Sequence, residues 1–403
     1  MDVPEPRADW RSKGFWLPDG ERAAAGYAAS RPSLFGGEFT WPVLVLRRAA
    51  AEANIATMAA YCRRHGLDFA PHAKTTMAPG LLAAQLDAGA WGMTVATANQ
   101  ALILRRLGVP RVLIANQVLD PVALRWLAGQ GAAGWEVYFQ VDSADGVAAA
   151  AAAAGAGVLR VFVELGHAGG RTGVRTPAEL EAVARQVAAS PGVELAGVTA
   201  YEGQLPDEPA VDAFLDQLVA GHKRLRAAGL LPERSIVSAG GSAWFDRVVD
   251  RLSALPEAAR VILRSGASVT HDDGFYLDRT PFRRVPREGP LTAALEIWAQ
   301  VLSTPEPGLA LAGMGKRDAP FDEGLPVPLE IRRADGATEP ATGLSVTRLN
   351  DHHTFLATGD VLLRPGELVR FGISHPCTAF DKWRDIPVID EDRRVVDVLH
   401  TYF

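Results

Sequence analysis

The feature that most constrains the fold of this chain is a regular alternation of short apolar runs with longer stretches rich in alanine and leucine. Nine such runs precede residue 270, and in order they are PVLVLR (42–47), DFAPHAK (68–74), GMTVA (92–96), RVLIAN (111–116), EVYFQVD (136–142), LRVFVEL (159–165), VELAGVTAY (193–201), SIVSAGG (235–241) and RVILRSG (260–266). Helices are expected between them, at 78–88, 97–107, 177–189 and 209–228. Apolar strands that are each followed by a helix indicate parallel pairing with both sheet faces covered.

About eight such strand–helix units close into a (β/α)8 barrel of ~250 residues, so the chain has one run more than a barrel needs. Either the first run pairs outside the barrel, or one of the runs is not a strand. Thr176 and Pro177 are typical of an N-cap and the first helical position. The alanine-rich stretch 148–157 is expected to end the helix after the fifth strand. The sequence therefore predicts a TIM-type barrel over residues 41–280.

The pattern changes after residue 280, where proline and glycine become frequent and helical periodicity fades. The segments AALEIWAQVLST, GLALAGMG, TGLSVTRLN, VLLRPGELVRFG and VVDVLHTYF are expected to be strands joined by turns. They predict a second, smaller, mostly antiparallel β-domain over 281–403. Residues 1–40, which include the aromatic segments WRSKGFWLPDG and LFGG, are expected to belong to it as well.

Charge and composition limit the partners and the compartment. The formal net charge is −6 and no basic cluster is present, so neither nucleic acid nor an anionic membrane is an expected partner. No apolar run reaches the ~18 residues that span a bilayer, and the opening MDVPEPRADW lacks a signal-peptide pattern. The two cysteines, Cys62 and Cys377, do not indicate a disulfide framework. A cytoplasmic protein is expected.

Lys74 is the first candidate for chemistry, because catalytic groups of such barrels collect at the carboxyl ends of the strands. It closes the second run. One interpretation is a strand-terminal lysine whose ammonium group reaches water. The other is an imine-forming amine, which becomes nucleophilic when its surroundings lower its pKa. His72, two residues earlier, is expected to share its face of the strand.

Glycine-rich turns follow three later runs, at 169–173, 238–242 and 264–268. Glycines let backbone N–H groups approach an anion, and a phosphate site after the last strands recurs in this architecture. Turns use glycine anyway, so each segment alone is a weak indication. Together with Lys74 they favour a phosphorylated carbonyl cofactor at the barrel mouth, and pyridoxal 5'-phosphate (PLP) fits that description.

Arg171 and Tyr201 follow the sixth and seventh runs. Arg171 is either an ordinary surface arginine or a donor to the pyridine nitrogen of the cofactor. Tyr201 either packs in an apolar core or lies against the cofactor ring. The sequence leaves both alternatives open.

His375 and Cys377 flank a proline, so in an extended segment their side chains would point the same way. Imidazole with thiolate is a zinc-type pair, although two ligands do not complete a structural site and a chance His-x-Cys is common. Upstream, NDHHTF offers Asp351, His352 and His353. Adjacent histidines in a strand face opposite ways, so at most one of them readily joins the same site.

The segment PHAKTTMAPGLLAAQLDAGAWGMTVATANQA resembles the lysine segment of the D-serine dehydratase and D-threonine aldolase family. Members of that family are PLP enzymes with the alanine-racemase-type barrel called fold type III. The match continues in order through GGRTGV, YEGQ, SAGGS, RSGASVTHDDGFY, GMGKRDAPFDEGLP, NDHHTFL and RPGELVRFGISHPCTAFDKW. The resemblance covers roughly residues 36–400. It is quite specific for the family, but it distinguishes less well among the family's members.

The resemblance implies roles for the cofactor residues. Lys74 would hold PLP, with His72 beside it, Arg171 would contact the pyridine nitrogen and Tyr201 would lie near the ring. The residues that would surround the phosphate are Gly240, Gly241, Ser242, Gly266, Ala267 and Ser268. A homodimer is also expected from the resemblance.

The resemblance further implies that His375 and Cys377 bind a divalent metal beside the substrate hydroxyl, with zinc as the first choice and manganese or magnesium as alternatives. His353 matches the catalytic histidine of the family's acidic–acidic–His segment. This chain has Asp351 and His352 where two acids are usual, which leaves the role of that segment open.

The implied activity is elimination from a small-molecule D-3-hydroxyamino acid, such as D-serine or D-threonine, to a 2-oxo acid and ammonia. Lys74 would remove the α-proton, and the metal would act as a Lewis acid on the β-hydroxyl. The alternative is retro-aldol cleavage to glycine and an aldehyde. The family's dehydratases resemble this chain in their His-x-Cys pair, whereas its aldolases look more like His-x-Asp, so Cys377 favours elimination. A third possibility, a PLP carrier without turnover, would need neither the β-domain nor this pair.

Overall fold

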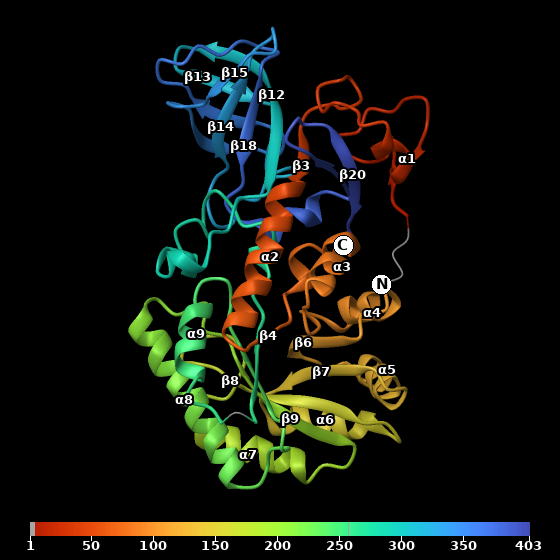
Figure 1. The fold of residues 1–403 in the computed structure, drawn as a ribbon, viewed down its shortest axis with the longest axis vertical. Helices are drawn as coiled ribbons and strands as arrows, with labels where there is room; N and C mark the ends of the chain where they lie inside the picture. Colours follow the sequence, from red (N-terminus) through yellow and green to blue (C-terminus); the bar gives the residue numbers. More distant parts are fainter. Residues whose placement is uncertain (1–4, 257) are drawn as a thin grey trace. The chain divides into compact units, whose positions relative to one another are not determined.

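The computed structural model describes residues 5–256 and 258–403, and the chain divides into two compact units (Figure 1). The first, called the barrel unit, contains Met58–Lys74 and Gln85–Gly266. The second, called the β unit, contains residues 5–57, Thr75–Ala84 and Ala267–Phe403. Lys74 is therefore the last residue of its segment of the barrel unit.

The barrel unit is built on eight parallel strands within the described residues. They are β4 (Asp68–Phe69), β5 (Met93–Val95), β6 (Arg111–Gln117), β7 (Glu136–Val141), β8 (Leu159–Leu165), β9 (Val193–Ala200), β10 (Ile236–Ala239) and β11 (Arg260–Leu263). The strand order is β4-β11-β10-β9-β8-β7-β6-β5. A parallel bridge between His72 and Thr94 joins the two edges, and the Thr94 N–H donates to the Pro71 carbonyl at 2.9 Å. The predicted (β/α)8 barrel is thus confirmed.

The first apolar run of the sequence forms β3 (Val43–Arg47), and it pairs outside the barrel. It lies antiparallel to β12 (Leu295–Glu306) and parallel to β19 (Asp385–Ile389) in the β unit. Of the two explanations for the surplus run, the first is therefore correct. The other eight runs provide the eight barrel strands.

The helices follow the strands as the alternating pattern predicts. Their bounds are α2 (Arg48–Arg64), α3 (Pro79–Asp87), α4 (Ala98–Arg106), α5 (Pro121–Ala132), α6 (Ala144–Ala154), α7 (Pro177–Ala188), α8 (Glu208–Ala227) and α9 (Phe245–Leu252). The Thr176 hydroxyl caps α7 by accepting from the Glu179 N–H, and the Glu179 carboxylate accepts from the Thr176 N–H. Pro177 takes the first helical position. The alanine-rich stretch ends α6 at Ala154.

The interior of the barrel is packed with side chains, as in other barrels of this kind. Tyr138 stacks on Phe162 with ring centroids 5.4 Å apart, and Leu113, Ile236 and Ile262 pack in the same cluster. Because this layer is apolar, polar chemistry in the barrel unit is confined to the ends of the strands.

The β unit contains a largely antiparallel sheet. Besides β3, β12 and β19 its strands are β13 (Leu309–Ala312), β14 (Val327–Arg332), β15 (Thr338–Pro340), β16 (Ser345–Leu349), β17 (Thr354–Ala357), β18 (Leu368–Gly372) and β20 (Val395–His400). The order is β15-β14-β18-β12-β13-β17-β16, and β3, β19 and β20 branch from it. The five predicted segments contain β12, β13, β16, β18 and β20. In contrast, β14 and β19 carry a proline and β17 has only four residues, so their sequence patterns are weak.

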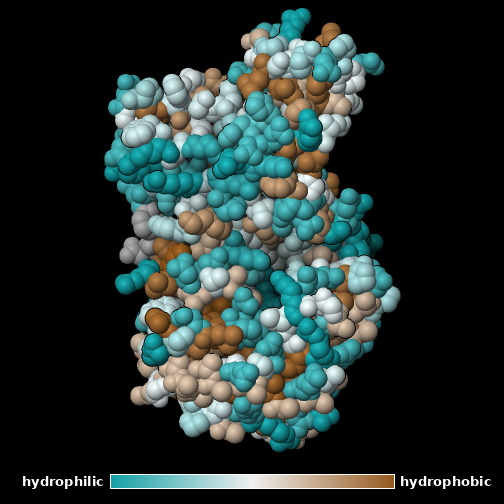
Figure 2. Space-filling model, turned by 180° about the vertical axis from the view of Figure 1, so that it is seen from behind, coloured by the Kyte–Doolittle hydropathy of each residue, from teal (hydrophilic) through white to brown (hydrophobic). Residues whose placement is uncertain are grey.

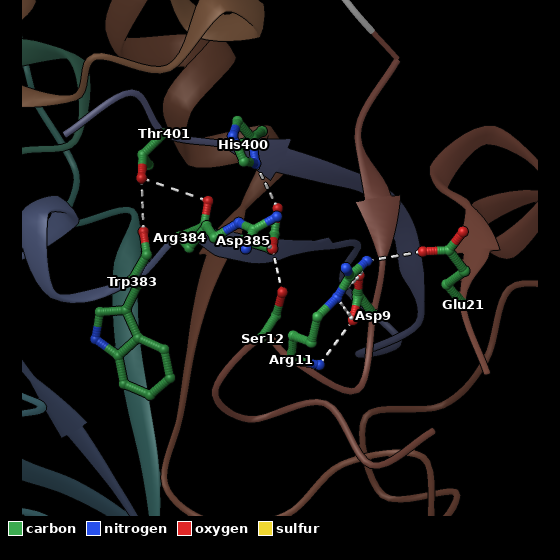
Figure 3. A network of polar contacts seen from close by, with 9 residues as sticks. All are labelled: Asp9, Arg11, Ser12, Glu21, Trp383, Arg384, Asp385, His400 and Thr401. Atoms are coloured by element: carbon green, nitrogen blue, oxygen red, sulfur yellow. Dashed lines mark hydrogen bonds and ion pairs between the residues drawn. The ribbon is translucent and has the colours of Figure 1, made fainter. Parts of the chain in front are cut away.

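The N-terminal segment packs against this sheet. It includes β1 (Arg7–Ala8), β2 (Arg22–Ala23) and α1 (Ala24–Ala29), and Phe15 and Tyr27 pack in one cluster with Trp298. Figure 3 shows the polar contacts beneath it. The buried Asp385 carboxylate accepts a hydrogen bond from the Ser12 hydroxyl and lies 2.7 Å from His400 Nδ1.

No helix among residues 5–256 and 258–403 combines the length and apolar character needed to cross a bilayer. On the face seen in Figure 2, hydrophobic residues form separate small patches among hydrophilic ones. Such scattered apolar surface is ordinary for a folded chain.

Candidate cofactor and metal sites

Lys74 lies on a short 3₁₀ helix, Ala73–Thr75, directly after the strand end at which His72 pairs with Thr94. The regular strand β4 covers only two residues, since the chain turns as soon as it reaches the end of the barrel. The expectation that His72 and Lys74 share one strand face is therefore wrong for Lys74. The lysine projects from a turn at the strand end, the place where barrels of this kind keep their chemistry.

His72 lies among positive charges. Burial lowers its pKa well below the ordinary value, and the charges of Lys74, Arg264 and Arg171 lower it further. Its Nδ1 is buried and has no hydrogen-bond partner among the described residues. The imidazole is therefore neutral near pH 7. The ends of β4, β8 and β11 thus bring an imidazole, a lysine and two arginines together.

Arg264 belongs to this cluster although sequence reasoning did not single it out. It follows β11 and is only 6% exposed. Its guanidinium group donates to the Thr199 hydroxyl at 2.7 Å and to the Ala200 carbonyl at 2.5 Å. Burial lowers its pKa, and the carboxylates of Glu202 and Glu164 oppose that change. An arginine that interrupts an apolar strand run is the pattern that could have identified it.

Arg171 and Tyr201 contact each other. The sequence analysis treated the two residues separately and did not predict this contact. The Arg171 guanidinium carbon lies 4.3 Å from the Tyr201 ring centroid, which is a cation–π distance. The ring covers Gly203 so closely that a Cβ there would lie 2.5 Å from the tyrosine oxygen. Arg175 supports the Arg171 loop by donating to the carbonyls of Arg171 and Gly173 at 2.7 and 2.6 Å.

The expected phosphate turn after β10 is held by a carboxylate. The N–H groups of Gly240 and Gly241 donate to Glu202 at 3.2 and 2.6 Å, and Ser242 Oγ lies 3.0 Å from Ser265 Oγ. Gly240 has φ +95°, a conformation that favours glycine. The remaining expected phosphate residues continue the chain after Ser265: Gly266 ends the barrel unit, and the buried Ala267 and Ser268 begin a 3₁₀ helix of the β unit.

Glu164 is a second buried carboxyl at this end of the barrel. It belongs to β8, and the Gln117 amide donates to it at 2.7 Å. Burial raises its pKa, while a hydrogen bond from Thr172 and the charge of Arg264 act in the opposite direction. The strand ends therefore carry buried carboxyl groups beside Lys74, Arg171 and Arg264.

These side chains fit PLP. The group offers a primary amine, two guanidinium groups that attract anionic oxygens, and the buried Nδ1 of His72 that has no partner among the described residues. Arg171 also contacts the aromatic ring of Tyr201. The chemistry of this donor set suits an anionic, aromatic carbonyl cofactor.

His375 and Cys377 belong to the β unit, and they do not lie on an extended segment. His375 precedes a 3₁₀ helix, Pro376–Thr378, because a proline suits the first position of a helical turn. The two side chains nevertheless meet, since Cys377 hydrogen-bonds to His375. Burial alone would lower the pKa of His375, but Cys377 and Asp322 outweigh it and raise the pKa to about 9.

Asp322 is the residue of this site that sequence reasoning missed. One carboxylate oxygen lies 2.7 Å from His375 Nδ1, and the other accepts from the Thr378 hydroxyl at 2.8 Å. The Cys377 sulfur lies 3.6 Å from the Thr75 hydroxyl. A carboxylate on one nitrogen of a histidine fixes the ring and leaves the other nitrogen for a metal. Imidazole and thiolate, so oriented, fit a divalent ion of the zinc type.

His353 lies on an exposed turn between β16 and β17, together with Asp351 and His352. Its carbonyl accepts from the Asn350 N–H at 2.8 Å, and His352 Nδ1 lies 3.7 Å from an oxygen of Asp318. Within residues 5–256 and 258–403, no three His, Cys, Asp or Glu side chains are grouped so that they could hold a metal ion. The structure therefore gives His375 and Cys377 as a pair, and the catalytic role of His353 stays a prediction.

Comparison with known proteins identifies the family. Residues 46–255 match the family model "Alanine racemase, N-terminal domain", and residues 294–389 match "Putative serine dehydratase domain". The first match alone spans about half of the chain. The chain belongs to the D-serine dehydratase and D-threonine aldolase family of fold type III. The resemblance carried by the sequence motifs is thus confirmed.

Among the relatives of this fold type III chain are two aldolases. The 3-hydroxy-D-aspartate aldolase of Paracoccus denitrificans (strain Pd 1222) is 29% identical over 308 residues, which cover 73% of this chain and 77% of the relative. The D-threonine aldolase of Arthrobacter sp is 29% identical over 337 residues, which cover 81% of this chain and 80% of that protein.

Two solved structures share the fold type III architecture. D-threonine aldolase from Filomicrobium marinum has a TM-score of 0.75 at 24% identity, covering 90% of this chain and 95% of that one. D-threo-3-hydroxyaspartate dehydratase from Delftia sp. HT23 has a TM-score of 0.71 at 24% identity, covering 90% and 97%. Both likenesses concern the fold.

Proposed function

We propose that this protein is a PLP- and divalent-metal-dependent lyase that acts on a D-3-hydroxyamino acid such as D-serine or D-threonine. It releases the β-hydroxyl as water, and a second water then hydrolyses the released enamine to a 2-oxo acid and ammonia. The observation that carries the proposal is the contact of His375 with Cys377, with the Asp322 carboxylate 2.7 Å from Nδ1 of the imidazole. An elimination needs an acid at the departing hydroxyl, and His375 and Cys377 are suited to bind a metal ion that would act as this Lewis acid.

Lys74 is the proposed attachment point of PLP and the base for the α-proton. When bound, PLP would stabilise negative charge at the substrate α-carbon. The Lys74 amine would accept the proton there, while neutral His72 and the two nearby arginines maintain a cationic environment. Arg171 and Tyr201 are proposed to contact the pyridine nitrogen and the ring. The proposed phosphate site comprises Gly240, Gly241, Ser242, Gly266, Ala267 and Ser268.

His375 and Cys377 are the proposed metal ligands, with zinc as the first choice and manganese or magnesium as alternatives. When bound, the ion would act as a Lewis acid on the substrate hydroxyl. A relative supports the assignment. Structures of D-threo-3-hydroxyaspartate dehydratase include a histidine-to-alanine variant and a cysteine-to-alanine variant, the latter in a metal-free form, at positions two residues apart. His375 and Cys377 have the same spacing.

The second candidate function is retro-aldol cleavage to glycine and an aldehyde. It is favoured by the two aldolases among the sequence relatives. Both reactions would use Lys74 and the metal pair, and they differ in which bond to the β-carbon breaks. His353 is proposed as the further catalytic histidine in either case. The expected homodimer and cytoplasmic location stay predictions.

Product analysis tests the proposal. The purified protein is supplied with PLP and Zn²⁺ and incubated with D-serine, D-threonine and D-3-hydroxyaspartate, with and without a chelator. Pyruvate from D-serine and 2-oxobutyrate from D-threonine, both lost with chelator, are the expected products. Glycine with acetaldehyde from D-threonine would establish cleavage instead. PLP absorbance without any product would overturn both functions in favour of a carrier.

A further inference from the structure

Glu202 is a carboxylate that the proposed chemistry does not use. It follows Tyr201 at the end of β9, and none of its surface is exposed. One oxygen accepts from the Gly241 N–H at 2.6 Å and the other from the Gly240 N–H at 3.2 Å. Both oxygens of a single carboxylate thus bind consecutive amides of the turn after β10. Hydrogen bonds to an ionised group are stronger than neutral ones.

The turn fits closely around this carboxylate and the neighbouring Tyr201 ring. Gly240 has φ +95°, and a Cβ at Gly241 would lie 3.0 Å from the Tyr201 ring and 3.4 Å from a Glu202 oxygen. A side chain at Gly241 would therefore crowd Tyr201 and Glu202, and one at Gly240 would strain the backbone and lie 2.6 Å from Leu263. Two glycines and one buried glutamate form a single structural unit.

A buried carboxylate requires a compensating charge, and Arg264 is close enough to supply it. The Glu202 charge is the largest of those that favour the charged form of Arg264. The Arg264 backbone N–H donates to the Gly240 carbonyl at 3.1 Å, and its side chain donates to Thr199 at 2.7 Å. Glu202 and Arg264 together fasten the ends of β9, β10 and β11 to one another.

The amides of Gly240 and Gly241 are thereby already engaged, which bears on how the turn would bind a phosphate. The groups that continue the turn are Ser242 and, from the next strand, Ser265, whose hydroxyl oxygens lie 3.0 Å apart. We propose that Glu202 is a positioning residue for the phosphate of PLP, holding the Gly240–Gly241 turn so that Ser242 and the Ser265–Gly266 segment receive the phosphate. This inference rests on the proposed PLP site.

Repulsion and positioning predict opposite effects of removing Glu202 on phosphate binding. A carboxylate near a phosphate repels it, so removing Glu202 would strengthen phosphate binding if repulsion were the dominant effect. If positioning dominates, removing it weakens binding, because the turn loses two charge-assisted hydrogen bonds. The sign of the change separates the two cases.

The test compares PLP with pyridoxal, which has the same aldehyde and ring but no phosphate. Dissociation constants of both are measured by absorbance on the full-length protein freed of PLP, for Glu202→Ala, Glu202→Gln and the wild type. Glu202→Ala should weaken PLP binding about tenfold or more, the loss expected for a charge-assisted hydrogen bond, and change pyridoxal binding less than about twofold. Glu202→Gln should lie between, because its amide oxygen can accept one of the two bonds.

Glu194→Gln is the matched control, since Glu194 is an exposed glutamate on the same strand; it should change neither constant. Thermal unfolding checks the fold, and if Glu202→Ala does not fold, Glu202→Gln carries the test. PLP binding that is unchanged or tighter in the variants, or an equal loss for PLP and pyridoxal, would overturn the inference. If the wild type binds PLP no better than pyridoxal, the proposed PLP site itself is wrong.

Discussion

Asp322 determines which nitrogen of His375 is available to a metal. Its carboxylate lies 2.7 Å from Nδ1 and is itself held by Thr378 at 2.8 Å. With Nδ1 occupied, Nε2 is the nitrogen left for an ion. The orientation of the ring is therefore set by the fold, and a ligand that is already oriented loses less freedom when it binds.

Asp322→Asn should weaken Zn²⁺ binding by about 10- to 100-fold, the range seen when such an outer partner of a metal-bound histidine is removed. The measurement is competition with a chromogenic chelator, which needs no turnover. Glu323→Gln is the control, because Glu323 is the exposed neighbour of Asp322. Equal affinities for wild type and Asp322→Asn would show that the carboxylate does not orient the ligand.

Lys74 can be tested through the bond it is proposed to form. Reduction of the PLP-loaded protein with borohydride, followed by peptide mapping, should place the adduct on Lys74. Lys74→Ala should lose the adduct, and its turnover should fall by at least about 10²–10⁴-fold, since it lacks the proposed base. An adduct on another lysine would disprove the assignment.

At the scale of elements, His222 connects α8 to the start of β10. Its Nε2 lies 2.9 Å from the Ser235 hydroxyl, and burial, with the charges of Arg226 and Lys223, lowers its pKa to about 4. The folded chain therefore keeps His222 neutral, whereas the unfolded chain protonates it below about pH 6.5. The unfolded state binds the extra proton, so this contribution to stability is lost as the pH falls from about 6.5 towards 4.

His222→Gln should make the free energy of unfolding less dependent on pH in that window. A glutamine can still bond to Ser235 but does not titrate. Urea unfolding at several pH values between 4 and 7 measures the effect. His65→Gln is the control, because His65 belongs to the same unit and its ring contacts Tyr61, away from Ser235. Identical pH slopes for wild type and His222→Gln would contradict the prediction.

The network of Figure 3 fastens the N-terminal segment to β19 and β20. The Asp385 carboxylate accepts a hydrogen bond from the Ser12 hydroxyl and lies 2.7 Å from His400 Nδ1. Asp385 is only 2% exposed. Asp385→Ala would leave two polar groups without their partner and should destabilise the chain by about 1–3 kcal/mol. Urea unfolding tests this, with the exposed Asp397→Ala as a control that should cost less than about 0.5 kcal/mol. Equal urea midpoints for the wild type and Asp385→Ala would show that the network does not contribute to stability.

The elements that sequence predicted are those whose patterns are local. The barrel strands repeat one apolar pattern, and Thr176 with Pro177 marks a helix start, so both could be recognised without a structure. The location of β3 could not, because an apolar run looks the same whether its partner is a barrel strand or β12. The same reason hid Asp322 and Glu202. Each acts through a contact with a residue far along the chain, and sequence spacing does not reveal such contacts.

At the scale of the whole molecule, Lys74 and its neighbouring arginines belong to one compact unit and the proposed metal pair to the other, although the proposed phosphate residues Ala267 and Ser268 belong to the β unit. Lys74, Arg171 and Arg264 belong to the barrel unit, whereas His375 and Cys377 belong to the β unit. Each set is held by contacts within its own unit, including the Arg264–Thr199 and Asp322–His375 hydrogen bonds. Cofactor and metal loading should therefore be separable, although the proposed turnover would require both.

Chelation should remove the metal and abolish turnover while the protein retains its PLP, measured by absorbance and by the borohydride adduct. Conversely, Lys74→Ala should keep the metal content of the wild type, measured by elemental analysis, since none of the proposed metal ligands belongs to the barrel unit. Restoring Zn²⁺ to the chelated protein should restore turnover without added PLP. Loss of PLP on chelation, or loss of metal in Lys74→Ala, would mean that the two sites depend on each other for their formation. The division of the chain into separately organised sites would then be wrong.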